Sequence, residues 1–191
     1  MHPDCDRSAS GGVVPAMERI ETLPGAGPDA FAELAERHLD DVYRYLVYLT
    51  GDRSMAEDLA ADTFERAYRE RKRFDPRRAG PKAWLLTIAR STALDHLRSE
   101  QRRRARDTRY ASGQPLAEDA PGLCDGYSAA LESALRALSA ADREVIALRV
   151  LLDLDAPVAA RLLGCSTTAC STRLSRALTR LATQMETHEH V

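Results

Sequence analysis

Apolar residues recur along the first half of the chain at the three- and four-residue spacing of amphipathic helices. The first series runs from Phe31 to Leu49 and stops at Gly51, a residue type that often ends a helix. Ser54 and, three residues later, Glu57 form the pattern of a capping box and predict the start of a second helix. The inner face of this second helix is expected to carry Met55, Leu59, Thr63, Phe64, Ala67 and Tyr68.

Helical periodicity resumes after a short loop. A third helix is expected from near Pro81, which suits a first helical turn, to about Arg106. Ser139 and Ser166 are the expected N-caps of two later helices. No segment alternates as a β-strand does, so the sequence predicts an all-α fold. The later helical segments are expected at about 127–138, 140–151, 156–163 and 167–184.

Two stretches lack any period and are rich in Gly, Pro and small polar residues, 1–28 and 108–126. We expect the first to be a disordered arm and the second to be a flexible, acidic linker. They divide the chain into two small helical domains, 29–107 and 127–185, followed by a short tail at 186–191.

The charges are segregated along the chain, although its formal net charge is only −2. Residues 29–62 contain nine acids and three arginines, whereas residues 66–109 contain fifteen bases and five acids. Residues 156–185 contain four arginines and no acid. Basic blocks of this kind are suited to binding a polyanion.

The stretch "LLGCSTTACSTRLSRALTRL" follows a short helix and predicts a break at Gly164 and then a longer helix. Two helices joined by a turn of about three residues that contains Gly are typical of a helix-turn-helix. In that motif the start of the second helix lies in the major groove of DNA. We expect Leu174, Leu178 and Leu181 to pack inward. The expected DNA-facing residues are Ser166, Thr167, Thr168, Ser171, Thr172, Arg173 and Arg176.

Cys165 and Cys170 lie in this stretch and raise the question of a metal or redox site. Zinc sites generally need a second pair of ligands, and the sequence offers no clear second pair. We therefore expect no metal and no cofactor, with Cys165 in the turn and Cys170 on the inner face of the helix. No glycine-rich phosphate loop and no nucleophile–base pairing appears at a recognisable spacing, so no catalytic residue is assigned.

No apolar run approaches the roughly 18 residues of a membrane span, and the first residues lack the apolar core of a signal peptide. We therefore expect a cytoplasmic protein without membrane insertion.

Three longer stretches carry a family resemblance. "LTGDRSMAEDLAADTFERAYRERKRFDP" and "AWLLTIARSTALDHLRSEQRRRAR" resemble region 2 of bacterial sigma factors, and "LSAADREVIALRVLLDLDAPVAARLLGCSTTACSTRLSRALTRL" resembles their region 4. The absence of other family regions between them is typical of the extracytoplasmic function (ECF) group. The resemblance implies a sigma factor, not an enzyme, that binds the RNA polymerase core, recognises the −10 and −35 elements of promoter DNA and aids DNA opening. It also makes an anti-sigma factor a candidate partner.

The resemblance assigns roles to individual residues, and it gives the helix-turn-helix residues above to the −35 element. We expect Arg173 to read a base and Arg176 to contact a phosphate. Ser91 and Ser171 stand where the family often has Asn and a long basic residue, and Pro157 stands where it often has Glu. The expected polymerase contacts are Asp58, Leu59, Asp62 and Phe64. The expected −10 contacts are Arg77, Arg78, Lys82, Arg90, Ser91, Arg98, Arg102 and Arg103.

Two other classes of protein compete with this interpretation. A stand-alone helix-turn-helix regulator would account for residues 127–184 but would give no purpose to the basic segment 84–109. A hydrolase or metal enzyme would need the clustered catalytic or ligating residues that the sequence does not display.

Overall fold

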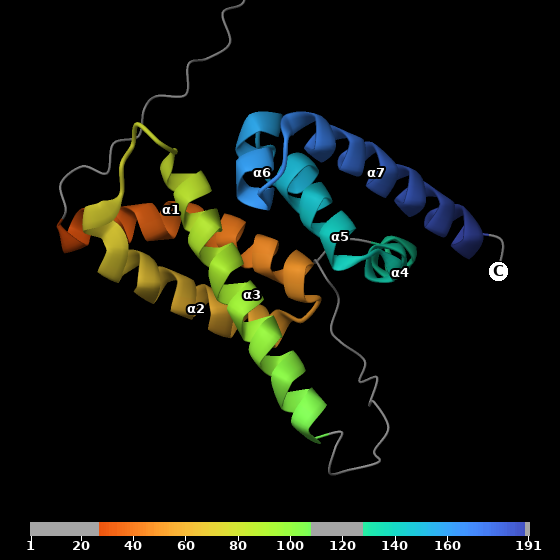
Figure 1. Ribbon diagram of the computed structural model, residues 1–191, viewed down its shortest axis with the longest axis horizontal. Coiled ribbons are helices and arrows are strands. Elements are labelled where there is room, and N and C mark those ends of the chain that lie inside the picture. The colour runs from red at the N-terminus through yellow and green to blue at the C-terminus, as the bar shows by residue number, and fades with distance from the viewer. Residues whose placement is uncertain (1–26, 108–127, 190–191) are drawn as a thin grey trace, which may run out of the picture.

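A computed structural model describes residues 27–107 and 128–189 of the chain, and the described residues form helices and turns without a strand (Figure 1). The predicted all-α fold is therefore confirmed. The arm expected at 1–28 and the linker expected at 108–126 lie almost wholly outside these residues. None of the described helices is long and apolar enough to cross a membrane.

Residues 27–107, here called the N-terminal unit, form a bundle of three helices that pack against one another. The first helix ends at Gly51, which adopts the left-handed conformation with φ of 75°. The helices are α1 (Pro28–Thr50), α2 (Arg53–Glu70) and α3 (Pro81–Asp107), with a short 3₁₀ turn, η1 (Arg71–Arg73), after α2.

The second helix begins at a different cap from the predicted one. Asp52 is the N-cap, and its side-chain Oδ1 accepts a hydrogen bond of 3.0 Å from the backbone N–H of Met55. The predicted cap, Ser54, is instead the second residue of α2. Asp52 takes this role because it directly follows Gly51 and has the extended backbone (φ −136°, ψ 122°) that an N-cap requires.

Residues 128–189, here called the C-terminal unit, form a cluster in which the last helix packs against three others (Figure 1). Ser139 caps its helix as predicted, by accepting a bond of 3.2 Å from the N–H of Asp142. The last helix reaches Glu189, within the segment expected to be a tail. The elements are α4 (Ala129–Ala137), α5 (Ala140–Ile146), the π-helical turn η2 (Ala147–Leu151), α6 (Ala156–Leu163) and α7 (Thr167–Glu189).

The segment expected to be one helix at 140–151 is divided between α5 and η2. The chain then turns through Asp153, which has a positive φ of 49°. Such a backbone is uncommon for a residue other than Gly, and the apolar pattern of this segment gives no sign of it. The turn directs the chain into α6.

The two units are packed against each other, which the sequence did not predict. Helix α1 contacts α5 and η2, and α3 contacts α6. The buried apolar residues of both units belong to one continuous cluster. The described helices therefore form a single closed body.

Candidate nucleic-acid interface

The turn between α6 and α7 has the geometry of a tight helix-turn-helix. Gly164 ends α6 with a φ of 67°, a backbone conformation in which any other residue would be strained. The next N–H, that of Cys165, bonds to the carbonyl of Ala160 at 3.0 Å. Ser166 Oγ then accepts a bond of 3.2 Å from the N–H of Ala169 at the start of α7. These bonds satisfy some of the backbone groups left free at the end of α6 and the start of α7, and they hold the turn in place.

One face of α7 anchors it to the rest of the C-terminal unit. Cys170 and Ala177 are fully buried, and Leu174 and Leu181 pack against the core. Leu178 was expected on this face but is 40% exposed. At about 100° per residue it lies some 80° around the helix from Cys170, at the edge of the buried stripe.

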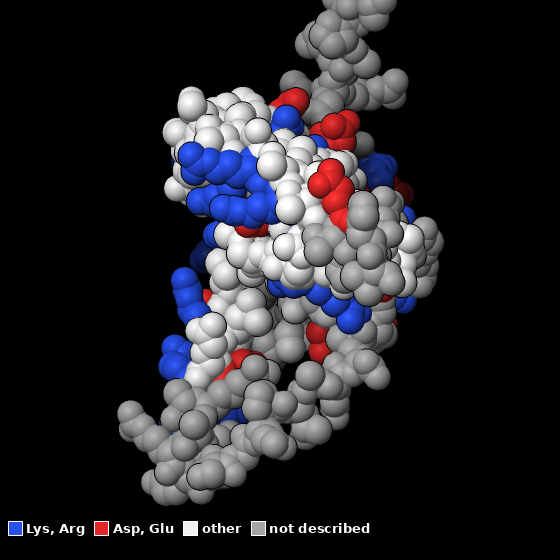
Figure 2. All heavy atoms as spheres, turned by 90° about the vertical axis from the view of Figure 1, so that its right-hand side faces the viewer, with Lys and Arg blue, Asp and Glu red and all other residues white. Residues whose placement is uncertain are grey.

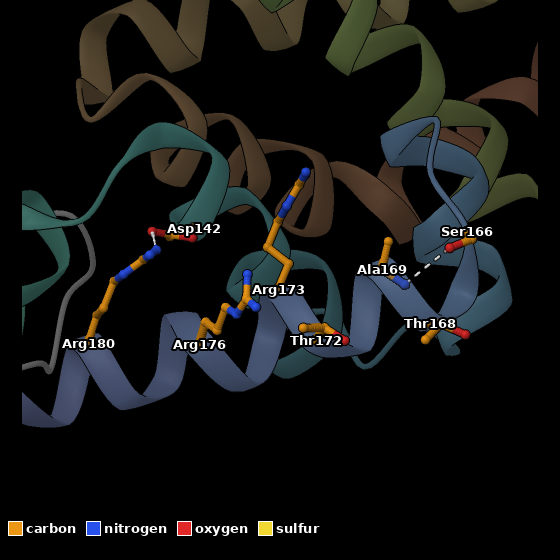
Figure 3. A pocket seen from close by; sticks show the side chains of 8 residues that line it. All are labelled: Asp142, Ser166, Thr168, Ala169, Thr172, Arg173, Arg176 and Arg180. Atoms are coloured by element: carbon orange, nitrogen blue, oxygen red, sulfur yellow. Dashed lines mark hydrogen bonds and ion pairs between the residues drawn. The ribbon is translucent and has the colours of Figure 1, made fainter.

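A groove lies beside this buried face, between α7 and the first turn of α5 (Figure 3). The side chains of Arg173, Arg176 and Arg180 all extend from the same side of α7 (Figure 3). Five of the seven predicted DNA-facing residues line the groove, and the other two, Thr167 and Ser171, are exposed outside it. The lining residues are Asp142, Ser166, Thr168, Ala169, Thr172, Arg173, Arg176 and Arg180.

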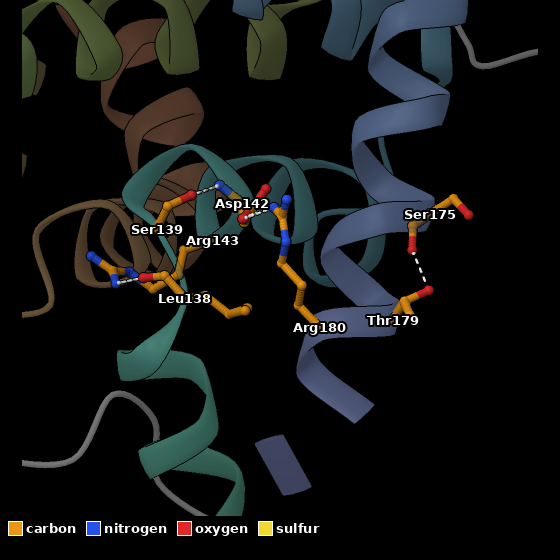
Figure 4. Close-up of polar contacts among 7 residues, drawn as sticks. All are labelled: Leu138, Ser139, Asp142, Arg143, Ser175, Thr179 and Arg180. Atoms are coloured by element: carbon orange, nitrogen blue, oxygen red, sulfur yellow. Dashed lines mark hydrogen bonds and ion pairs between the residues drawn. The ribbon is translucent and has the colours of Figure 1, made fainter. Parts of the chain in front are cut away.

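Asp142 and Arg180 are a pair that the sequence did not predict. The Nη1 of Arg180 lies 2.6 Å from Oδ2 of Asp142, whose side chain is only 8% exposed (Figure 4). Asp142 is held in the first turn of α5, which Ser139 caps. The two residues are 38 positions apart, so only the packing of α5 on α7 brings them together. The pair fixes one arginine at the end of the groove.

The groove is cationic, because three arginines and one carboxylate line it. In the space-filling view of Figure 2, basic side chains gather on the upper part of the face turned to the viewer. Guanidinium groups beside hydroxyl groups suit both phosphates and the edges of bases. The arrangement can therefore hold a nucleic-acid backbone and contact bases.

A second basic surface covers part of the N-terminal unit. Arg77 and Arg78, in the loop before α3, are exposed, and so are the three arginines on the second half of α3 that were assigned to the −10 element. Several of them have acidic neighbours on the same element, such as Arg78 and Asp75 at 3.6 Å. Exposed pairs of this kind contribute little stability, so these arginines remain available to another anion. The three on α3 are Arg98, Arg102 and Arg103.

The other three residues assigned to this surface are less accessible. Ser91 Oγ accepts a hydrogen bond of 3.4 Å from Arg66 Nη1. The side chains of Lys82 and Arg90 bind groups of the C-terminal unit. Lys82 Nζ donates to the carbonyl of Leu152 at 3.0 Å. The predicted −10 residues therefore divide into five exposed arginines and three that bind within the protein.

Arg90 joins a buried polar cluster. Glu144 Oε1, on α5, accepts one bond of 2.7 Å from Arg90 Nε and one of 2.8 Å from the hydroxyl of Tyr45 on α1. Burial, with the nearby charge of Glu144, raises the pKa of Tyr45 well above its usual value, so the phenol stays a donor. Burial alone would lower the pKa of Arg90, but the hydrogen bond and the charge of Glu144 raise it.

Trp84 packs within the protein. Its ring centroid is 5.0 Å from that of Phe74, in a tilted arrangement, and its side chain lies partly buried against the core. This packing gives Trp84 a structural role in the N-terminal unit.

The outer face of α2 carries an acidic surface. Asp58 and Asp62 are exposed, whereas Leu59 is 2% exposed and Phe64 is half-buried against the core. The two carboxylates are therefore the accessible members of the set assigned to polymerase contacts, and Leu59 supports the helix from within.

The two cysteines of the helix-turn-helix are free thiols. Cys170 is completely buried, and burial together with the neighbouring Cys165 raises its pKa. Within the described residues no three His, Cys, Asp or Glu side chains come together as a metal site would require. Cys170 thus acts as a small apolar side chain under α7.

Comparisons with known proteins agree on one family. Residues 34–103 match the model of Sigma-70 region 2, and residues 128–181 match that of Sigma-70, region 4. The chain is 35% identical over 169 residues to the ECF RNA polymerase sigma factor BldN of Streptomyces coelicolor, covering 87% of this chain and 64% of BldN. It is 33% identical over 164 residues to the ECF RNA polymerase sigma factor SigC of Mycobacterium tuberculosis, covering 85% of each chain.

A solved structure is also similar. The sigma factor RpoE in its complex with the anti-sigma factor NepR, from Bartonella quintana, aligns with a TM-score of 0.68 and 28% identity. The alignment covers 82% of this chain and 96% of that one. The two family regions occur in the expected order, and both relatives match across most of the chain. The chain therefore belongs to the ECF sigma factors of the sigma-70 family.

Proposed function

We propose that this chain is a promoter-specificity subunit of RNA polymerase, which binds the polymerase core and directs initiation at promoters with −10 and −35 elements. The observation that carries the proposal is the groove along α7, where five of the residues predicted for the −35 element come together beside Arg180. The family membership supports the same function.

The C-terminal unit would bind the −35 element as duplex DNA. The N-terminal half of α7 carries exposed Thr and Ser residues and the exposed Arg176, which suit a helix that enters the major groove. Arg180, held by Asp142, lies further along the helix, where the backbone of the duplex would pass. Phosphate contacts of this kind would orient the helix, and contacts to base edges would supply specificity.

The N-terminal unit would bind the −10 element and hold its separated strand. Bases released from a duplex are bound by cationic surfaces that follow the backbone, together with pockets or stacking groups. The exposed arginines of the loop before α3 and of the second half of α3 supply the cationic surface. Polymerase core would dock on the acidic face of α2. The bond-forming chemistry belongs to the polymerase, so the chain itself needs no catalytic group.

An anti-sigma factor is a further proposed partner. The support is the likeness to RpoE, whose solved structure contains the anti-sigma factor NepR. Because RNA polymerase acts in the cytoplasm, binding to its core would also place the chain there.

Run-off transcription tests the proposed function. Purified polymerase core without any sigma factor would be supplied with this chain and with DNA that carries the promoter of its own gene. We expect transcripts of one defined length only when the chain is present, and fewer of them with Arg176→Ala. Binding to a palindromic duplex without polymerase, combined with no transcript, would instead indicate a stand-alone regulator.

A further inference from the structure

The groove beside α7 contains an acid where a polyanion is expected to bind. Asp142, on α5, is the one carboxylate among the residues that line the groove, and the other charged residues there are three arginines. A carboxylate close to a duplex repels its phosphates, so the charge of this acid by itself weakens binding. The side chain of Asp142 is only 8% exposed, and its carboxylate binds Arg180. The effect of the acid on DNA binding therefore depends on what it does to Arg180.

Arg180 is held at one edge of its guanidinium and open at another. Its Nη1 lies 2.6 Å from Oδ2 of Asp142, while its side chain remains 59% exposed. In Figures 3 and 4 the side chain extends from α7 to the carboxylate on α5. A guanidinium carries several N–H donors arranged as a planar fork, so one edge can bind a carboxylate while another binds a second anion. Arg180 therefore keeps donors for a phosphate.

The carboxylate is a fixed anchor for this arginine. Asp142 lies in the first turn of α5, where its backbone N–H donates to Ser139 Oγ at 3.2 Å and to the Ser139 carbonyl at 3.0 Å. Helix α5 in turn packs against α7. A long side chain without an anchor samples many rotamers, and it loses this freedom when it binds a ligand. The anchor restricts Arg180 before any DNA is present.

Arg180 ends a row of side chains that follows the length of α7. Residues four positions apart lie on one face of a helix, and the helix rises about 6 Å from each to the next. Arg180 is therefore about 18 Å from Thr168 along the axis, whereas the major groove is about 12 Å wide. With Thr168 inside the major groove, Arg180 reaches its rim, where the phosphates lie. The four members of the row, all of which line the groove of the protein, are Thr168, Thr172, Arg176 and Arg180.

We propose that Asp142 is a positioning residue for promoter binding, which holds the guanidinium of Arg180 toward a backbone phosphate at the rim of the −35 major groove. This inference rests on the proposed function. Because Arg180 is ordered when the protein folds, less freedom is lost when the duplex binds. The acid therefore strengthens DNA binding despite its negative charge, and Arg180 extends the contact one helical turn beyond Arg176.

Asp142→Asn tests the proposal because it removes the charge of the anchor while keeping the size of the side chain. Polymerase core loaded with the full-length chain would be titrated onto a labelled duplex that carries the promoter of the chain's own gene, with unlabelled duplex of unrelated sequence in excess. We expect binding about two- to tenfold weaker than with the parent chain, the range for one side chain that must be ordered on binding. Tighter or unchanged binding would show that the acid only opposes the phosphates, and would overturn the proposal.

Asp153→Asn is the matched control. Asp153 is an exposed acid of the same unit that does not line the groove, and Asn tolerates its positive φ of 49°. We expect this variant to bind the promoter as the parent chain does. A loss equal to that of Asp142→Asn would mean that any acid of this unit has the same effect, which would contradict a specific role for Asp142.

A double-mutant cycle with Arg180→Ala shows whether Asp142 acts through Arg180. Arg180→Ala should weaken binding and lower the salt dependence by about one counterion, because one phosphate contact is lost. In this background Asp142→Asn should cause no further loss. An unchanged salt dependence with Arg180→Ala would show that Arg180 touches no phosphate and that the pair only supports the fold. An equal loss from Asp142→Asn with and without Arg180 would also overturn the positioning role.

Thermal melts check that each variant is folded. If Asp142→Asn is unfolded, Arg180→Lys takes its place, because lysine keeps the positive charge but lacks the fork that can bind two anions at once. We expect the same two- to tenfold loss, and binding equal to that of the parent would overturn the proposal. If the parent chain itself adds no promoter binding to polymerase core, the proposed function is contradicted, together with the positioning role that rests on it. Unweakened binding by Asp142→Asn in a complex that does bind contradicts the positioning role alone.

Discussion

Arg173 and Arg176 of α7 differ in how far they protrude from the helix. Arg176 is exposed, whereas Arg173 is half-buried in the groove. The sequence led us to expect that Arg173 reads a base and Arg176 a phosphate. The exposures favour the opposite division, because a base edge inside the major groove is reached by side chains that stand out from the helix.

We therefore expect Arg176→Ala to change the preference for one base pair of the −35 element, at a cost of about 1–3 kcal/mol in binding. Arg173→Ala should weaken binding to every sequence alike and lower the salt dependence by about one counterion. Transcription from a promoter library with each variant, combined with a salt titration of duplex binding, measures both effects. A changed base preference for Arg173→Ala alone would restore the original expectation.

The cysteines give a second prediction for single residues. Replacing Cys165 and Cys170 together by alanine should leave promoter-dependent transcription largely intact. It should lower the thermal midpoint modestly, because Cys170 fills a buried space under α7. The measurement is a thermal melt alongside run-off transcription and a zinc assay. Stoichiometric zinc in the parent protein, lost in the double variant together with activity, would show that the cysteines form a metal site.

The sequence predicted most helices well, and its errors lie at their ends. The expected start of α3 at Pro81 and the bounds of α6 agree with the structure, because a proline at the start of each helix and a clear apolar stripe mark them. The start of α2 was wrong, since Asp52 and Ser54 are both good N-caps and the pattern alone does not choose between them. The π-helical turn η2 has no pattern that could have predicted it.

Asp52→Ala and Ser54→Ala are a matched test of the observed cap. Asp52→Ala removes the acceptor of the Met55 N–H and should lower the free energy of unfolding by about 1 kcal/mol. Ser54→Ala, at an exposed position inside the helix, should change it by less than about 0.5 kcal/mol. Denaturant titration of both variants measures the difference. A larger loss for Ser54→Ala would favour the predicted capping box.

The acidic face of α2 gives another prediction for an element. Reversing the charge of Asp58 and Asp62 together, by Asp58→Lys and Asp62→Lys, should weaken binding to polymerase core and leave the helical circular dichroism unchanged, because both side chains are exposed. The control is Glu33→Lys with Glu36→Lys, two exposed acids of α1 that are not assigned to the docking surface. Equal losses from both pairs would indicate a general charge effect and not a docking site.

At the scale of the whole molecule, the sequence predicted the two helical units but not their contact. Tyr45 and Glu144 are 99 positions apart in the sequence. Arg90 is one of many basic residues in its segment, and nothing in the sequence sets it apart from the others. Only the packing of α1 and α3 against α5 and α6 shows that these side chains meet. The same is true of Asp142 and Arg180, which pair across the groove. Contacts between elements distant in sequence therefore define both the groove and the packing of the two units.

The central claim is that this chain directs initiation at two spaced promoter elements. The most direct measurement is transcription of fragmented DNA from the protein's own genome by sigma-free polymerase core, with and without the chain, followed by sequencing of RNA 5′ ends. We predict new start sites that share one sequence element near −10 and a second near −35. No new start sites, or starts that share only a single palindromic element, would contradict the claim.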